Sequence, residues 1–157
     1  MHPLMQRTLI LLKPDCVQRN LIGEIITRFE RKGLKLVGMK MITLDDAILV
    51  EHYSHIADKA FFPEVRDFMK KSPVVALVLE GHSVVDVVRK LLGKTLGRDA
   101  DIGTIRGDFS ISIAANLVHA SDSLETAGKE IARFFKDDEL FDYQRVDVDF
   151  IYMSDEK

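Results

Sequence analysis

The sequence predicts an α+β fold, in which helices cover a four-stranded antiparallel sheet in the order β-α-β-β-α-β. Four apolar runs have the length of a strand, and segments with helical spacing lie between them. The chain of 157 residues shows no linker, internal repeat or low-complexity stretch. A chain of this length favours one domain, so we take residues 1–157 as a single domain.

The predicted strands are short apolar segments bounded by turn residues. Residues 8–12 end at Lys13-Pro14, and residues 74–79 contain only apolar side chains. Residues 34–43 follow Gly33 and form the second strand in chain order. Residues 110–118 are largely apolar and are predicted as the last strand.

The predicted helices span residues 20–33, 45–53, 61–69, 83–93 and 122–134, each with apolar residues on one face. Asn20 is a candidate N-cap, and Gly33 is placed to end the same helix in a left-handed conformation. Ser83 and Asp86 have the spacing of a capping box, and Asp122 precedes the last helix. Residues 96–107 contain three glycines and no periodicity, which predicts a loop.

Composition indicates a folded protein with a charged surface. Hydrophobic residues make up 46% and charged residues 30%, and no apolar run approaches the ~18 residues of a membrane span. Residues 1–6 are too few and too polar for the apolar part of a signal peptide. The one cysteine, Cys16, cannot form an internal disulfide, which favours a reducing, cytoplasmic location.

The net charge of -3 argues against a dedicated nucleic-acid binder, whose domain is usually basic. A few cations gathered in one cleft still bind phosphate on an acidic protein, because the local field decides. Gly93-Lys94-Thr95 resembles the end of a P-loop, but Val88 stands where the first glycine is needed and the preceding segment is helical. His52 and His55 have no acidic or cysteine ligand to complete a metal set, so both are predicted to lie on the surface.

His119 stands between an apolar run and the start of a helix, where free N–H groups favour a phosphate ligand. A histidine is a nucleophile when one ring nitrogen is unprotonated and an acceptor holds the other. Glu130, further along the following helix, is a candidate for that acceptor. Taken alone, the same residues also suit a structural histidine.

Basic residues form a second group of candidates. Lys13 ends the first strand, Arg89 lies in a helix, and Arg106 lies in the glycine-rich segment. Thr95 adds a hydroxyl group. Ligand-binding groups gather at strand ends and loops, so these residues predict a polyphosphate cleft, although each alone is an ordinary surface residue.

Three stretches of the chain, residues 7–15, 103–109 and 116–122, together resemble the nucleoside diphosphate kinase family. The resemblance extends from about residue 7 to 152 and implies the ferredoxin-like split β-α-β sandwich. It also implies a short helical turn at 106–109, then a loop, then a strand that ends at His119. It implies a homohexamer, with a tetramer as the alternative.

The resemblance implies a role for each matching residue. His119 would carry the phosphoryl group in a ping-pong cycle between nucleoside triphosphates and diphosphates. The phosphates would be bound by Lys13, Arg89, Thr95 and Arg106, and Tyr53 would help to fix Lys13. The imidazole would be oriented by Ser121 and Glu130. Asn116 would bind the sugar, Phe61 would stack on the base, and Val65 would flank the base. Stacking accepts every base, so broad specificity is expected. Mg²⁺ would arrive on the nucleotide phosphates.

Some positions depart from the family pattern. Ile102 stands where the family loop commonly has proline, and Lys59-Ala60 replaces the usual Arg-Pro. Cys16 and Asn20 replace small residues, and Cys16 is expected to pack as a small hydrophobe. Two alternatives remain at this stage. One is a family member that acts as a regulatory partner without activity, and the other is a ferredoxin-like module that binds nucleic acid.

Overall fold

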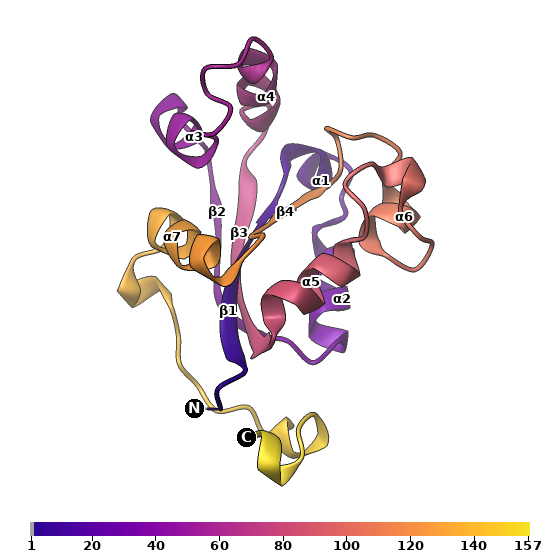
Figure 1. Cartoon of the computed structure of the whole chain (residues 1–157), viewed down its shortest axis with the longest axis vertical. Coiled ribbons are helices and arrows are strands. Elements are labelled where there is room, and N and C mark those ends of the chain that lie inside the picture. The colour runs from indigo at the N-terminus through magenta and orange to yellow at the C-terminus, as the bar shows by residue number, and fades with distance from the viewer. Residues whose placement is uncertain (1) are drawn as a thin grey trace.

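The computed structural model describes residues 2–157 and contains a four-stranded antiparallel sheet in the order β2-β3-β1-β4 (Figure 1). The strands are β1 (Met5–Leu12), β2 (Lys35–Ile42), β3 (Val74–His82) and β4 (Val118–Ala120). The predicted α+β, ferredoxin-like arrangement is confirmed. Met1, the first residue of the expected domain, lies outside the described residues.

Seven helices accompany the sheet in the described part of the chain. They are α1 (Pro14–Gln18), α2 (Ile22–Arg31), α3 (Asp46–His52), α4 (Phe62–Met69), α5 (Val84–Leu92), α6 (Ile105–Phe109) and α7 (Leu124–Phe134). Short 3-10 turns follow at Gly97–Asp99, Asp137–Glu139, Val148–Phe150 and Ser154–Glu156. None of the helices within residues 2–157 combines the length and apolarity needed to cross a membrane.

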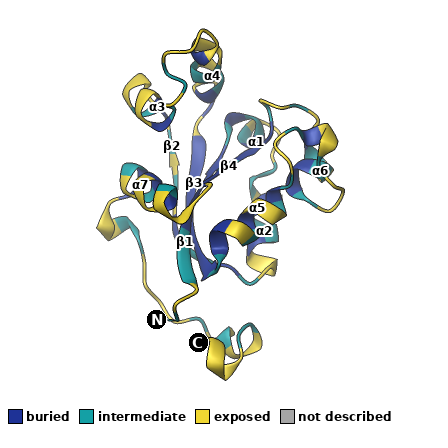
Figure 2. Cartoon of the chain, viewed as in Figure 1, coloured by how far each residue is buried: buried dark blue, intermediate teal, exposed yellow. Residues whose placement is uncertain are grey.

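Strand β1 is buried on both faces of the sheet. Ile10 and Leu12 pack in the core beneath α2 and α5, whereas Leu9 and Leu11 pack in a second core beneath α3, α4 and α7. Figure 2 shows dark, buried ribbon along the sheet between the two helical layers. Because helices cover both faces, β1 carries the apolar run Leu9–Leu12 and β3 carries the apolar run Val74–Leu79, which is why both strands were predictable.

The predicted strand at residues 110–118 is wrong, because only Val118–Ala120 pairs with β1. The residues before it fold back on themselves. The hydroxyl of Ser110 donates to the carbonyl of Ala115, and the Gly97 amide donates to the Ser112 carbonyl. The arrangement implied by the family resemblance is confirmed, with α6 at Ile105–Phe109 and a strand that passes through His119.

Asn20 ends helix α1 and does not cap α2, so this predicted cap is wrong. Its φ of 57° is left-handed, and the next amide, of Leu21, donates to the carbonyl of Cys16. Helix α1 was not predicted, because five residues are too few to show a helical period. Cys16 is fully buried in the core, as expected of a small apolar residue.

The starts of α5 and α7 also differ from the sequence expectations. Ser83 adopts a φ of 47° and its side chain caps nothing, so the predicted capping box is absent from α5. Ser123, rather than Asp122, caps α7 by accepting a hydrogen bond from the Thr126 amide. A side chain caps a helix only from extended backbone, which Ser123 has and Ser83 lacks.

Candidate active site

His119 enters the site from the middle of β4, on the face of the sheet covered by α3, α4 and α7. It lies opposite Leu11 of β1 in the antiparallel register, and Leu11 packs on that face. Glu130 approaches from α7, where it lies on the inner side of the helix between Ala127 and Phe134. The helical period that buries those two residues therefore also buries the Glu130 carboxylate.

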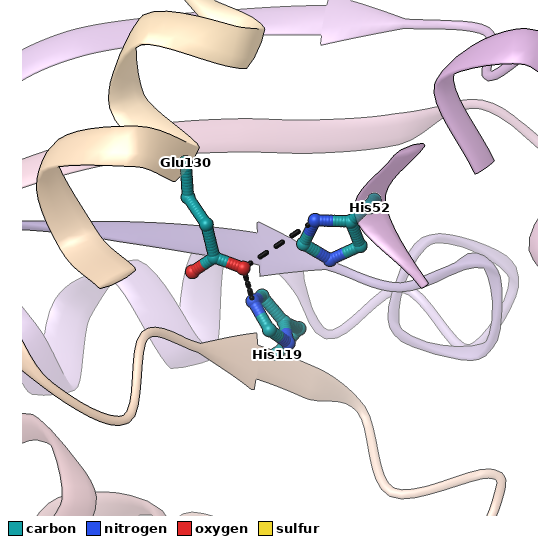
Figure 3. Close-up of side chains that lie close together, drawn as sticks. All are labelled: His52, His119 and Glu130. Carbon is teal, nitrogen blue, oxygen red and sulfur yellow. Dashed lines mark hydrogen bonds and ion pairs between the residues drawn. The ribbon is translucent and has the colours of Figure 1, made fainter. Parts of the chain in front are cut away.

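The imidazole of His119 is held at one nitrogen only. Its Nε2 lies 2.8 Å from Oε2 of Glu130 (Figure 3). The hydroxyl of Ser121 donates to Oε1 of the same carboxylate at 2.6 Å. A carboxylate can only accept, so Nε2 carries the proton and Nδ1 keeps its lone pair. The ring is 26% exposed, which leaves Nδ1 free to meet a ligand. This is the arrangement of an oriented nucleophile.

Glu130 is ionised although it is buried. Burial opposes its ionisation, but the hydrogen bonds from His119 and Ser121 outweigh that effect and hold its pKa below the usual value. The carboxylate therefore supplies negative charge beside the imidazole. A positive charge that develops on the ring during reaction is stabilised in place.

His52 also reaches this group, so the prediction of a surface position for His52 is wrong, while His55 is exposed as predicted. Its ring packs edge-to-face on His119, with centroids 4.5 Å apart. Its Nδ1 lies 3.3 Å from Glu130 Oε2 and accepts a hydrogen bond from Arg133 at 3.1 Å. Burial, and then the charge on His119, lower the pKa of His52 to about 3, so it is neutral.

His52, His119 and Glu130 place their ligating atoms within 4.8 Å of one another and are the one such cluster within residues 2–157. Two of the three donors are imidazole nitrogens, whereas Mg²⁺ prefers oxygen. Arg133 already donates to the Nδ1 that a metal would need. The cluster therefore orients His119 and does not fit a Mg²⁺ cage.

Lys13 lies where β1 passes into α1. Its Nζ donates to the carbonyl of Ala114 at 2.7 Å and to Oδ1 of Asn116 at 3.0 Å. The Asn116 amide in turn donates to the carbonyl of Thr95. Burial lowers the pKa of Lys13 to about 8; the charge of Asp15 opposes this shift. The Lys13 ammonium therefore has neutral hydrogen-bond partners and readily accepts an anion.

Arg106 is buried and bonds the backbone at three points. Its guanidinium donates to the carbonyls of Gly93, Asn116 and Val118, the last at 2.6 Å. Burial, followed by the charge of Arg89, lowers its pKa to about 10, so Arg106 stays charged. Arg106 thus both braces the loop and contributes positive potential, while Arg89 and Thr95 are exposed at the rim.

Leu117 forms a strained turn just before β4. Its φ is 74°, and the Val118 amide donates to the Asn116 carbonyl at 2.9 Å, which defines a γ-turn. Such a conformation costs about 1–3 kcal/mol for a residue other than glycine. The turn changes the chain direction between Asn116, which contacts Lys13, and His119.

A cleft of about 820 Å³ opens beside Lys13. It is lined by Lys13, Tyr53, Phe61, Val65, Phe68 and Ile113, among others. Phe61 is 53% exposed and presents a free aromatic face. Burial, and then Glu130, raise the pKa of Tyr53 to about 12, so its hydroxyl is protonated. Within residues 2–157 no hydrogen bond joins Tyr53 to Lys13, although both line the cleft.

The predicted site residues thus fall into three adjoining groups. The imidazole group contains His119, Ser121 and Glu130, and sequence reasoning missed its fourth member, His52. The cationic group contains Lys13, Arg89, Thr95, Arg106 and Asn116, and the cleft group contains Tyr53, Phe61 and Val65. Phe68 was also missed, although its ring lies 5.4 Å from Lys13 Nζ.

Comparisons with known proteins agree with this geometry. The family described as nucleoside diphosphate kinase matches residues 6–140. A nucleoside diphosphate kinase from Parabacteroides distasonis is 55% identical over 152 residues, covering 97% of this chain and 99% of the relative. The chain belongs to the nucleoside diphosphate kinase family.

Solved nucleoside diphosphate kinases share the fold. The halophilic enzyme from Halobacterium salinarum, in complex with CDP, has a TM-score of 0.91 and 45% identity, and covers 94% of this chain and 98% of its own. The structure of the enzyme from Borrelia burgdorferi is a transition state mimic with bound vanadate and ADP. Its TM-score is 0.85 and its identity is 40%, and the match covers 92% of this chain and 95% of the Borrelia chain.

Membership of the nucleoside diphosphate kinase family makes this chain an enzyme, a phosphotransferase that acts on nucleotides. This assignment agrees with the enzyme predicted from the sequence. Membership of the family disfavours the nucleic-acid module, and the high identity to relatives named as the kinase disfavours the inactive regulatory partner.

Proposed function

We propose that this chain transfers the γ-phosphate of a nucleoside triphosphate to a nucleoside diphosphate through a phosphohistidine at His119. The observation that supports this most is the Nε2–Glu130 bond, which leaves the Nδ1 lone pair of His119 as the free nucleophile. A covalent intermediate splits the transfer into two steps at one site. The cycle is therefore ping-pong.

In the first step His119 Nδ1 attacks the γ-phosphorus, and the bond from that phosphorus to the β–γ bridging oxygen breaks. The leaving diphosphate takes the electron pair of that bond. The imidazole gains positive charge, which the ionised Glu130 offsets through Nε2–H. In the second step a terminal oxygen of another diphosphate attacks the same phosphorus and releases Nδ1.

Lys13, Arg89 and Arg106 neutralise the phosphates during both steps, with Thr95 as a hydroxyl donor at the rim. The neutral hydrogen-bond partners of Lys13 support its role in phosphate binding, because they leave its positive charge free to act on the phosphates. Asn116, bonded to Lys13, is placed to bind the sugar. Ser121 and Glu130 hold the imidazole, and Tyr53 supplies a protonated hydroxyl in the cleft.

Phe61 stacks on the base and Val65 flanks it. Both line the cleft beside Lys13, and a related enzyme was solved with CDP. Stacking on an aromatic face requires no particular base edge. We therefore propose broad base specificity.

Mg²⁺ would arrive on the nucleotide and would supply positive charge that offsets the charge of the phosphates. The chain provides cations and neutral donors at the phosphate site. The one His/Glu cluster within residues 2–157 offers mainly nitrogen ligands, whereas Mg²⁺ prefers oxygen. The protein residues therefore bind the phosphates and leave the metal to the phosphate oxygens.

Three further expectations stay part of the proposal. Residues 1–157 form a single domain, supported by one sheet that draws on residues 5–120. The assembly is a homohexamer, with a tetramer as the alternative, and the exposed Ile102 and Ile111 are surfaces for subunit contact. The location is cytoplasmic, supported by the free thiol of Cys16.

The test uses γ-labelled ATP with Mg²⁺, followed by GDP. We expect wild-type protein to take up label that survives base, is lost in acid and passes to GDP. His119→Ala should take up none, whereas His82→Ala, the same change at the other end of the sheet, should transfer normally. Uptake by His119→Ala at the wild-type rate would refute the phosphohistidine.

A further inference from the structure

Asp15 is the one residue of the first family stretch whose side chain bonds the strained turn. It lies in α1, two residues after Lys13, and its Oδ2 accepts the Leu117 amide at 2.9 Å. Its Oδ1 is buried without a hydrogen-bond partner within residues 2–157.

Hydrogen bonds from two other segments hold the backbone of the turn at Leu117. Asp15 binds the Leu117 amide, and the Lys13 amide donates to the Leu117 carbonyl at 2.8 Å. Arg106 binds the carbonyls on both sides, of Asn116 and Val118. A fully buried leucine at a φ of 74° relaxes unless such contacts oppose it.

The turn connects two parts of the site. On its N-terminal side Asn116 binds Lys13 Nζ, and on its C-terminal side β4 presents His119 to Glu130. A change in φ at Leu117 therefore moves Asn116, and with it the contact to Lys13, relative to the imidazole. Phosphoryl transfer depends on that alignment more than on any other protein contribution.

We propose that Asp15 is a positioning residue whose carboxylate holds the strained Leu117 turn and thereby aligns Lys13 and Asn116 with His119. This inference rests on the proposed function. Asp15 acts through the backbone and is not a phosphate ligand, since its charge repels phosphate. Its charge also acts on Lys13, where it opposes the fall in pKa that burial causes.

The first experiment measures single-turnover labelling of His119 by γ-labelled ATP over a range of ATP concentrations. Asp15→Ala should lower the maximal rate about 30-fold, because misplacing a reacting group by about 1 Å costs up to 10²-fold. Asp15→Asn, whose amide oxygen still accepts from Leu117, should lose less. The half-saturating ATP concentration should change less than about threefold, since the phosphate-binding residues that hold ATP before the reaction are all retained.

Glu139→Gln is the matched control. Glu139 also accepts a backbone amide, that of Lys136, in a segment remote from His119. We expect its labelling rate to equal wild type while its unfolding temperature falls as much as that of Asp15→Asn. Equal labelling rates in Asp15→Ala and wild type would overturn the proposal.

The second experiment separates strain from loss of a buried side chain. Leu117→Gly and Leu117→Ala both remove the leucine, but only glycine adopts a φ of 74° without strain. In the Asp15→Ala background, the glycine variant should label His119 at least about fivefold faster than the alanine variant. Equal rates would mean that Asp15 does not act on this turn.

Failure of this inference is distinguishable from failure of the proposed function. If wild-type protein takes up no label, the phosphohistidine proposal fails. If wild-type protein labels, His119→Ala does not, and every Asp15 variant labels normally, only the role of Asp15 fails. Far-ultraviolet circular dichroism of each variant identifies any protein that has not folded, and the paired glycine and alanine variants then decide.

Discussion

The two ends of strand β1 carry similar residues but use their charges differently. At the Met5 end, Arg7 and Lys35 both pair with Glu80, and Arg145 pairs with Asp147. At the Lys13 end, Lys13, Arg89 and Arg106 form no ion pair within residues 2–157. Histidines stand at both ends, and His82 packs against Tyr152 at the Met5 end.

The difference shows which cations serve stability and which serve binding. A cation paired with a nearby carboxylate has its charge neutralised and contributes little field beyond that pair. A buried cation bound only to carbonyls and amides keeps its field, and its burial is costly until an anion arrives. The cavity of about 270 Å³ at the Met5 end is lined by Lys35, Glu80 and Arg145, whose charges are already paired.

The largest effect is expected from removing an unpaired cation. Lys13→Ala should reduce kcat/KM for transfer from ATP to GDP by about 10²–10³-fold, the usual loss of one charge-stabilising donor. Lys35→Ala, at the paired end, should stay within about threefold of wild type. Steady-state kinetics measure both variants. Similar losses in the two would contradict the claim that the unpaired cations serve binding and the paired cations serve stability.

A smaller loss is expected when the acceptor of His119 loses its charge. Glu130→Gln should lower kcat about 10–100-fold, because a hydrogen bond to a charged group contributes about 1.5–3 kcal/mol. Glu125→Gln changes an exposed carboxylate on the same helix, paired only with Lys129, and should match wild type. Transient labelling of His119 measures both variants. Full activity of Glu130→Gln would contradict the proposal that the Glu130 carboxylate stabilises the His119 imidazole during the reaction.

The pH dependence tests whether Lys13 supplies its charge. Burial lowers the pKa of Lys13 to about 8, so Lys13 is protonated below pH 8 and neutral above it. Binding of ADP should therefore weaken as pH rises through 8, by up to about tenfold between pH 7 and pH 9. Lys13→Arg keeps its charge and should bind ADP without this change, although less tightly.

Calorimetric titration of ADP at several pH values measures this dependence. Asp15 and Arg106 are the charged groups that act on Lys13, and Arg106, whose pKa is about 10, stays largely charged over this range. An identical pH dependence in Lys13→Arg would assign the titration to another group. A flat wild-type profile would show that Lys13 stays charged throughout.

The smallest effect on activity is expected at the paired end. Glu80→Gln removes the buried partner of Arg7 and Lys35, so the unfolding temperature should fall by about 3–8 °C. Activity should stay within about twofold of wild type. Differential scanning calorimetry and steady-state kinetics measure the two quantities, and a large loss of activity would contradict the division between the two ends.

The sequence was sufficient for the features that depend on local pattern. Strands β1 and β3 each contain an apolar run, Leu9–Leu12 and Val74–Leu79, because helices bury both faces, and the three stretches shared with the family contain many of the candidate site residues. Ile111 and Ile113 misled the prediction of a strand at 110–118, since both are more than 60% exposed in a loop. Apolar composition cannot distinguish that loop from a strand.

Other features depend on contacts between distant segments. Burial of His52 follows from the packing of α3 against Glu130 of α7, which no local pattern of a seven-residue helix contains. The positive φ of Leu117 is equally hidden, because leucine rarely adopts it without outside contacts. Such tertiary constraints concentrate at functional sites, where local rules are expected to fail.

The turn at Leu117 also bears on when during synthesis the enzyme becomes active. Lys13 meets Asn116, and Asp15 meets Leu117, across more than 100 residues of chain. The hydrogen bond between His119 and Glu130 can form only after α7 has been synthesised. A nascent chain that has formed β1, β2 and β3 therefore has no assembled phosphate site, and phosphoryl transfer begins only after the last strand and helix have left the ribosome and docked.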